Sequence, residues 1–138
     1  MVNKKAFTLI ELLLVVAIIS ILAVIVVAAL TTSRSSGENA SVKSNLKSAQ
    51  NQAEVFYNDL GAGTYVGLCG DPLFKKGLDS AMKSSGDSVS VCIVSSGNES
   101  WAASTKLKIP EGTSSYWCVD SRGVSKGETT ILVTESCP

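Results

Sequence analysis

The sequence contains four cysteines and no histidine, which limits the chemistry that the cysteines can take part in. Without histidine the chain can form no Ser-His-Asp triad, no Cys-His pair and no zinc site of mixed Cys and His ligands. No two cysteines form a C-x-x-C pair, so a metal site would need four widely spaced thiolates. We therefore expect no metal and two disulfides, for which three pairings are possible. The residues concerned are Cys69, Cys92, Cys118 and Cys137.

A second chemical feature is a single acid, Glu11, at the start of a long apolar segment. The next residues, 12–30, contain no charge, glycine or proline and are interrupted only by Ser20. As a helix, this segment would measure about 28 Å, or about 36 Å if counted from Phe7, which is enough to span a bilayer. Two lysines precede it, which predicts that the N-terminus stays in the cytoplasm and that the rest is exported.

A cleaved secretory signal is the alternative for this segment. Such a signal begins with similar charges, but its apolar region has at most about 15 residues and ends at a small-residue cleavage site. Here the apolar segment is longer and continues into Thr31-Thr32-Ser33-Arg34 without an A-x-A element. The sequence therefore favours a retained membrane helix.

The position of Glu11 has two interpretations. A carboxylate in an apolar membrane segment costs about 2.5 kcal/mol or more, so it must be protonated, close to the interface or paired. Because Glu11 lies six residues from Lys5, it could reside at the membrane surface. Alternatively, its positive partner belongs to another molecule when several such helices form a bundle.

The start of the chain combines a basic leader, the small residue Ala6 and the run Phe7-Thr8-Leu9-Ile10-Glu11, followed by the apolar segment. This arrangement resembles the processing signature of type IV pilins and of the pseudopilins of type II secretion. The resemblance implies that a prepilin peptidase cleaves between Ala6 and Phe7 and that Phe7 is then N-methylated. It also implies that Glu11 pairs with the amine of a neighbouring subunit. Ala6 replaces the glycine that usually precedes the cut.

The resemblance implies a structural protein and not an enzyme: the major pilin of a type IV pilus. The expected partners are further copies of the chain, the prepilin peptidase and the assembly machinery in the membrane. No cofactor is expected, and equal numbers of basic and acidic residues, 12 of each, predict no general attraction for nucleic acid. A pseudopilin or minor pilin is the alternative, and a membrane-tethered monomeric binding module is a more distant one.

Three parts are expected: a cleaved leader at 1–6, a membrane and filament-core helix at 7–30, and an exported domain at 31–138. Early in this domain, apolar residues recur every three or four positions, which predicts that an amphipathic helix continues the first one. These residues are Val42, Leu46, Ala49, Ala53, Phe56 and Leu60. Gly37, in the polar stretch before them, is either a hinge or part of one long helix.

The remainder predicts a small sheet. Residues 61–87 are irregular, with a short helix predicted at 73–83. Four β-rich runs then follow, and their short connectors favour antiparallel pairing. The runs are 88–94, 100–109, 115–120 and 129–135. The expected fold is α+β and pilin-like, with a long N-terminal helix, transmembrane and then amphipathic, packed on a small antiparallel sheet.

The placement of the cysteines favours one of the three pairings. A bond between Cys69 and Cys92 would join the irregular segment to the first strand. A bond between Cys118 and Cys137 would fix the end of the chain to an inner strand, and it resembles the C-terminal disulfide loop of many pilins. Each closure of about 20 residues would contribute on the order of 3 kcal/mol.

Two questions stay open at the level of sequence. Asn39 and Asn98 both fit the N-glycosylation pattern, but such triplets are frequent by chance in a serine-rich chain. Ser20 and Ala28 stand where many family members carry glycine and proline and where their helix melts in the filament. Because neither residue breaks a helix, local melting is not encoded here.

Overall fold

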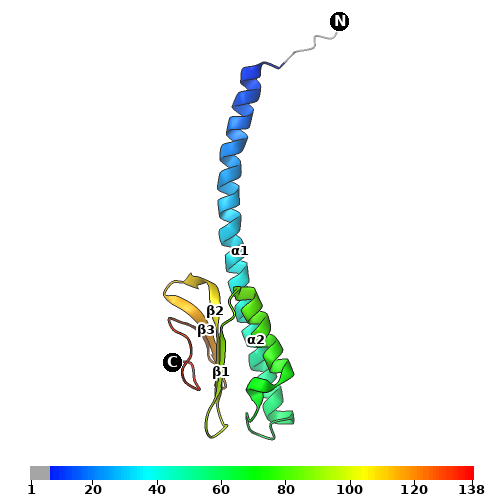
Figure 1. The fold of residues 1–138 in the computed structure, drawn as a ribbon, viewed down its shortest axis with the longest axis vertical. Coiled ribbons are helices and arrows are strands. Elements are labelled where there is room, and N and C mark those ends of the chain that lie inside the picture. The colour runs from blue at the N-terminus through cyan, green and yellow to red at the C-terminus, as the bar shows by residue number, and fades with distance from the viewer. Residues whose placement is uncertain (1–6) are drawn as a thin grey trace. The chain divides into compact units, whose positions relative to one another are not determined.

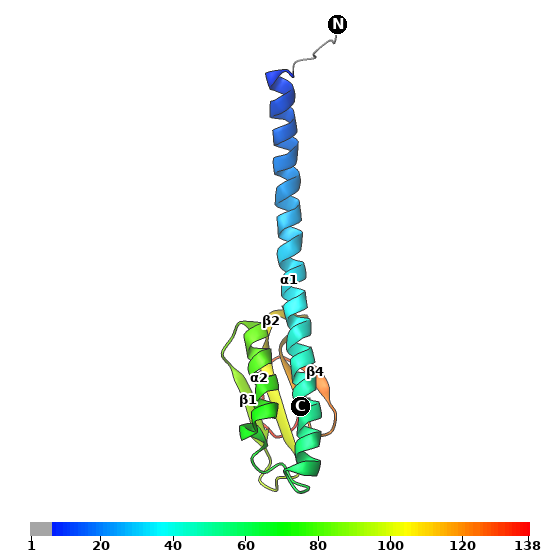
Figure 2. The same ribbon diagram turned by 90° about the vertical axis from the view of Figure 1, so that its right-hand side faces the viewer.

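The computed structural model describes residues 7–138, a part of the chain that contains two α-helices, a short 3-10 helix and a four-stranded sheet (Figures 1 and 2). The elements are α1 Leu9–Asp59, η1 Leu68–Gly70, α2 Pro72–Ser85, β1 Ser90–Val94, β2 Trp101–Glu111, β3 Ser114–Asp120 and β4 Ser125–Glu128. The chain divides into two compact units, Met1–Arg34 and Ser35–Pro138, and α1 contributes residues to both. The predicted α+β fold is confirmed.

Within the second unit, α1 turns one apolar side toward the core. Four residues spaced three or four positions apart are fully buried and pack against α2 and the sheet, as the amphipathic pattern predicts. They are Val42, Leu46, Ala49 and Ala53. Gly37 lies inside α1, and a Cβ at this position would meet no atom within 4 Å. The structure therefore agrees with the second interpretation, in which Gly37 is part of one long helix.

The end of α1 differs slightly from the predicted pattern. The helix stops at Asp59, and Leu60, the last residue of the expected stripe, is 72% exposed. The amide of Leu60 donates to the carbonyl of Phe56, and the chain then turns through left-handed backbone at Gly63, with φ 82°. Because this turn redirects the chain, the last apolar position of the pattern does not reach the core.

Both ends of α2 carry residues suited to helix termini. The side chain of Asp71 accepts hydrogen bonds from the amides two and three residues later, at 3.0 and 2.9 Å, and Pro72 occupies the first turn. Gly86 follows the last turn with φ 71°, a left-handed conformation that favours glycine. The short helix predicted at 73–83 is confirmed, with slightly wider bounds.

Helices α1 and α2 lie side by side and run antiparallel (Figure 2). The hydroxyl groups of Ser41 and Ser84 are 2.9 Å apart, and farther along α1, Ala49 faces Gly77. A Cβ on Gly77 would lie 2.8 Å from the Cβ of Ala49. The two helices therefore approach so closely here that only glycine fits without a shift.

The sheet is an antiparallel meander in the order β1-β2-β3-β4. One face packs against α1 and α2 around Trp101, which is fully buried and has the ring of Phe74 edge-on at 5.2 Å. On the opposite face, Ala102 and Cys118 pack with residues of the C-terminal segment. Alternate residues of β2 and β3 therefore serve two separate apolar clusters.

The prediction of a fourth strand at 129–135 is wrong. The strand beside β3 is β4, Ser125–Glu128, and no strand follows it among the described residues. The reason is the tight turn after Asp120, which returns the chain beside β3 so early that pairing uses the polar residues of β4. The apolar residues then cross the outer face of the sheet, where Leu132 is buried and its amide donates to Oγ of Ser104 at 3.2 Å.

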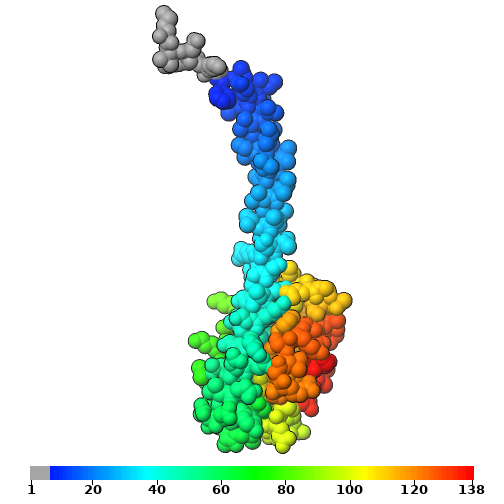
Figure 3. Space-filling model, turned by 180° about the vertical axis from the view of Figure 1, so that it is seen from behind, coloured from blue at the N-terminus to red at the C-terminus, as the bar shows by residue number. Residues whose placement is uncertain are grey.

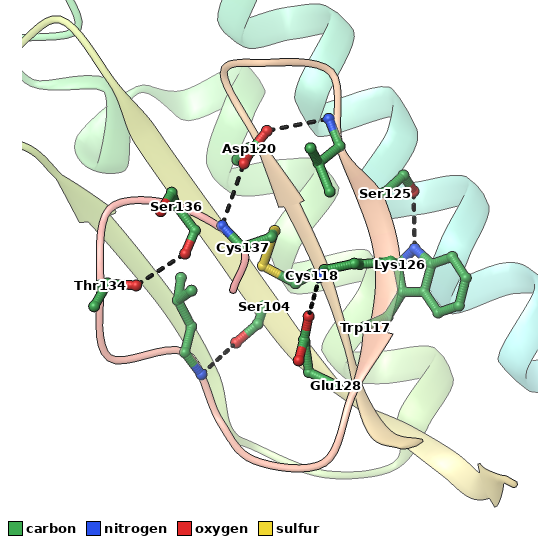
Figure 4. Close-up of a disulfide and its surroundings, with 12 residues drawn as sticks. Ser104, Trp117, Cys118, Asp120, Ser125, Lys126, Glu128, Thr134, Ser136 and Cys137 are labelled. Carbon is green, nitrogen blue, oxygen red and sulfur yellow. Dashed lines mark hydrogen bonds and ion pairs between the residues drawn. A yellow bond between two sulfur atoms is a disulfide. The ribbon is translucent and has the colours of Figure 1, made fainter. Parts of the chain in front are cut away.

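A disulfide and one buried carboxylate hold this C-terminal segment on the sheet (Figure 4). Cys118 of β3 is bonded to Cys137, with 5.9 Å between their Cα atoms. Asp120 is 1% exposed, and its Oδ2 accepts hydrogen bonds from the amide of Cys137 at 3.2 Å and from the guanidinium of Arg122 at 3.0 Å. The carboxylate therefore has charged and neutral donors that satisfy its burial.

Polar contacts join α1 to the β3 side of the sheet. Nε2 of Gln50, a buried side chain, donates to the carbonyl oxygen of Asp120 at 2.7 Å. Nζ of Lys43 lies 4.3 Å from the ring centroid of Trp117. In Figure 3 this part of α1, coloured cyan to green, lies beside the orange residues of β3 and β4. These contacts fix the position of α1 across the sheet.

Candidate functional site

The first unit presents an apolar surface on every side of α1. All side chains from Phe7 to Leu30 are exposed, and the most apolar window of 18 residues has a mean hydropathy of 3.4 with none of it buried. By length and composition, α1 could cross a membrane. A helix that is apolar all round requires an apolar environment, which lipid or neighbouring helices supply.

At the N-terminal end of this surface, Thr8 and Glu11 form a capping box. The amide and the hydroxyl of Thr8 both donate to Oε2 of Glu11 at 2.9 Å, and the amide of Glu11 lies 3.4 Å from Oγ1 of Thr8. Helix α1 begins at Leu9, so Thr8 is its N-cap residue and Glu11 its third residue. The acid therefore satisfies helix-terminal donors inside its own chain.

The capping box was missed by the sequence analysis, which considered Glu11 only in relation to charges. The spacing Thr8-x-x-Glu11 ahead of an apolar run was the available signal. Both hydrogen bonds use Oε2, and among residues 7–138 no group donates to Oε1. One carboxylate oxygen is therefore open to a donor from elsewhere.

Of the two residues of the expected cleavage bond, the structure describes one, Phe7. Phe7 precedes the capping box and is 81% exposed, so an enzyme or a neighbouring chain could reach it. Ala6, the other residue of the expected cleavage bond, lies outside the described residues. The structure thus brings Thr8 and Glu11 together next to Phe7.

The polar side chains within the apolar segment bond to their own helix. Oγ of Ser20 donates to the carbonyl of Val16 at 2.8 Å, and Oγ1 of Thr31 donates to the carbonyl of Ala28 at 2.8 Å. Such bonds satisfy a hydroxyl without a partner from another helix or from water. The surface around these residues therefore behaves as apolar.

The cysteines occupy a different region, in the second unit. Cys69 of η1 is bonded to Cys92 of β1, with 5.8 Å between their Cα atoms, and the other bond joins Cys118 to Cys137. These are the pairings that the sequence analysis favoured. Residues 7–138 include no free thiol and no cluster of three or more His, Cys, Asp or Glu side chains that could hold a metal.

One of the two candidate glycosylation residues is inaccessible. Asn39 is fully buried in α1, where its Nδ2 donates to the carbonyl of Ile109 at 2.8 Å and to Oε1 of Glu111 at 3.0 Å. Its Oδ1 accepts the amides of Lys108 and Ile109 at 2.7 and 3.2 Å. Because all of its hydrogen-bonding positions are used, Asn39 fixes the end of β2 to α1 and offers no room for a sugar.

The ion pair beside Asn39 adds charge to this junction. Nζ of Lys43 lies 2.5 Å from Oε2 of Glu111, and it holds the pKa of this carboxyl below its usual value of 4.5. The hydrogen bond from Asn39 lowers the pKa further, while partial burial opposes both effects. These interactions join α1 to the end of β2.

The comparison with known proteins gives one match, which lies at the N-terminal end of the chain. Residues 1–27 match the family described as prokaryotic N-terminal methylation motif. No curated protein and no solved structure matches the chain. The matched residues include the basic leader, the capping box and most of the apolar segment. The resemblance found in the sequence is thereby confirmed: the chain carries the prepilin signal of type IV pilins and pseudopilins.

Proposed function

We propose that the chain is a structural subunit of a type IV pilus, its major pilin, and that it polymerises through the apolar part of α1. The prepilin spans the cytoplasmic membrane at 7–30 with the leader 1–6 inside and residues 31–138 outside. A prepilin peptidase removes the leader before Phe7, whose new amine is N-methylated. Membrane-bound assembly machinery then adds the subunit to an extracellular filament.

One observation carries this proposal: the apolar part of α1 is exposed on every side, and near its start a single acid has one carboxylate oxygen without a donor among the described residues. Packing among Leu, Ile and Val side chains of neighbouring copies would cover the apolar surface. A carboxylate buried in such a bundle without a partner would cost several kcal/mol. The amine of Phe7 in the next copy is a suitable partner, so the charge pair would set the register between copies.

The capping box supports this pairing in two ways. Thr8 holds Oε2 of Glu11, which limits the rotation of the carboxylate and leaves Oε1 to accept the neighbouring amine. It also reduces the cost of keeping Glu11 in the membrane before assembly, because two donors already reach it. The acid is then prepared for its partner in the unassembled subunit.

The helix itself is proposed to persist in the filament. Ser20 and Ala28 lie within α1, and no glycine or proline stands between them. The hydroxyl of Ser20 bonds to the preceding turn, so unwinding would cost that bond as well as the backbone bonds. Hydrogen exchange of the segment between Ser20 and Ala28 in filaments would be slow if this is correct.

A first experiment identifies the processed chain. Filaments sheared from the cell surface are imaged by electron microscopy, and their main component is measured by mass spectrometry. We expect filaments made mainly of this chain, beginning with N-methylated Phe7. A chain found only in trace amounts would instead be a minor pilin or pseudopilin. An intact leader on a monomer would favour the membrane-tethered binding module.

A second experiment tests the charge pair. Glu11→Ala should leave membrane insertion and both disulfides intact but reduce filament yield about tenfold or more, because the amine loses its partner. Glu135→Lys is a suitable control, since it changes an exposed acid of the second unit. Normal filament yield from a strain that makes only Glu11→Ala would contradict the charge-pair mechanism.

A further inference from the structure

The charged residues of the second unit fall into a paired and an unpaired set. Three lysines around the end of β2 have acidic partners within 4.0 Å. Those pairs are Lys43 with Glu111, Lys106 with Asp87 and Lys108 with Glu38. On α2, by contrast, Lys76 and Lys83 are exposed and have no ion pair among the described residues. The lysine face of α2, defined as Lys76 and Lys83, therefore has no ion-pair partner among the described residues, and the acid that lines the same hollow, Asp79, is paired with Lys75.

A groove with two acidic residues, called the acidic groove here, lies at the C-terminal end of α1. It is a hollow of about 230 Å³ lined by Gln52, Val55, Phe56, Asp59, Leu60, Asp71 and Leu73. Leu60 and Leu73 are 72% and 58% exposed, so the groove presents apolar side chains at the surface. Asp59 has no ion pair among the described residues, and Asp71 caps α2. An exposed apolar patch with a charged rim is typical of an interaction surface.

Of the two acids of this groove, Asp59 is unfavourably placed at the end of α1. The last turn of α1 contains no basic residue, and it ends with Asp59, whose negative charge faces the negative end of the helix dipole. A basic group from outside would relieve this repulsion. Lysine is well suited, because its aliphatic stem can lie along the exposed leucines of the groove while its ammonium reaches a carboxylate.

Within one copy, neither lysine of this face forms an ion pair with Asp59. Lys83 is next to Ser84, which contacts Ser41 of α1, and from there to Asp59 the helix rises about 27 Å. Lys76 lies beside the groove, because the hollow that it lines shares Gln52 and Leu73 with the groove, but it makes no ion pair with Asp59. Complementary surfaces at different places on one molecule form a head-to-tail contact between copies, which gives an open polymer when the rotation between copies does not close a ring.

We propose that the acidic groove of one copy receives the lysine face of α2 from a second copy. This inference rests on the proposed filament function and adds a contact between second units to the contact between apolar helices. The contact would be electrostatic in part, so high salt should weaken it. It would also fix the orientation of neighbouring second units around the filament.

A reciprocal charge exchange in the full chain tests the proposal. Asp59→Lys and the pair Lys76→Asp with Lys83→Asp each place like charges against each other, whereas the combination restores attraction with reversed signs. Asp59→Lys should not harm the fold, because a lysine suits the end of a helix. Glu135→Lys is the control for the change in net charge that Asp59→Lys makes, and alkylation of free thiols reports misfolding.

The yield of sheared filaments is the readout. We expect each reversal to lower it about tenfold or more and the combination to recover most of the loss, while the control changes nothing. Reversals that assemble like the original chain would overturn this inference and leave the filament function standing. A combination no better than its parts would also overturn it and would indicate another basic occupant. Absence of filaments from the unaltered chain would instead overturn the proposed function itself.

Discussion

Helix α1 serves the two units in opposite ways. In the first unit it exposes apolar side chains on all sides and buries none. In the second unit it buries one apolar stripe and presents polar residues elsewhere. The second unit therefore has a core of its own, whereas the first requires a cover that the described chain does not provide. Folding and assembly should depend on different residues of the same helix.

The largest contrast is expected from one substitution made in both units. Leu46 is fully buried, so Leu46→Ala should lower the free energy of unfolding of the second unit by about 2–5 kcal/mol. Leu22 is 56% exposed, so Leu22→Ala should leave that free energy unchanged and reduce filament yield. Urea unfolding of the full chain in detergent, followed by tryptophan fluorescence, measures the first effect. Equal destabilisation by both changes would refute the separation.

The contact between α1 and α2 provides the next test. Gly77→Ala should destabilise the second unit by about 1–3 kcal/mol, because its Cβ would lie 2.8 Å from that of Ala49. Adding Ala49→Gly removes the clashing atom and should restore part of the loss. The same urea unfolding measures both variants. If the double variant were less stable than Gly77→Ala alone, the close approach of the helices would not be the cause.

A smaller effect is expected at the capping box of the first unit. Thr8→Val removes the hydroxyl donor to Glu11 and should weaken the first turn of α1 by about 1 kcal/mol, whereas Thr8→Ser should keep it. Hydrogen exchange of the peptide that begins at Phe7, measured in micelles, should become faster only for Thr8→Val. Unfolding of the second unit should not change. Equal exchange in the two variants would show that the hydroxyl contributes nothing.

The smallest effect concerns pH and the junction of α1 with the sheet. Because Lys43 holds the pKa of Glu111 below 4.5, the unfolded chain binds this proton at a higher pH than the folded chain does. The contribution of Glu111 is present above pH 4.5 and is lost as the pH falls through the folded pKa. Thermal unfolding should lose less stability between pH 5 and about 3 in Glu111→Gln than in the original chain. Parallel curves would contradict this contribution.

The parts of the fold that repeat a simple period were predictable from the sequence. The stripe from Val42 to Ala53 follows the helical period, and three of the four strands contain alternating or β-branched residues bounded by turns. β4 was not predictable in this way, because its residues, Ser125–Glu128, are polar and are paired only through the preceding turn. There the local geometry of the turn outweighs β-propensity.

The site was predictable where it depends on residue order and not where it depends on distant contacts. The processing signature is continuous in sequence, so the motif at residues 1–27 could be recognised from residue order, whereas the roles of Phe7 and Glu11 stay predictions. Asn39 and Asp120 gave no comparable signal, because their partners lie at the end of β2 and in the C-terminal segment. A buried polar residue resembles an exposed one until its partners are placed around it.

The two disulfides would limit how far a subunit of the proposed filament extends under load. They join residues separated by 23 and 19 positions in the sequence, and these loops stay closed when the rest of a subunit is stretched. At up to about 3.4 Å per residue, they withhold roughly 80 and 65 Å of chain. A subunit that unfolds under force would therefore lengthen much less than a chain of the same size without disulfides. A reductant that breaks the two disulfides would allow it to lengthen further.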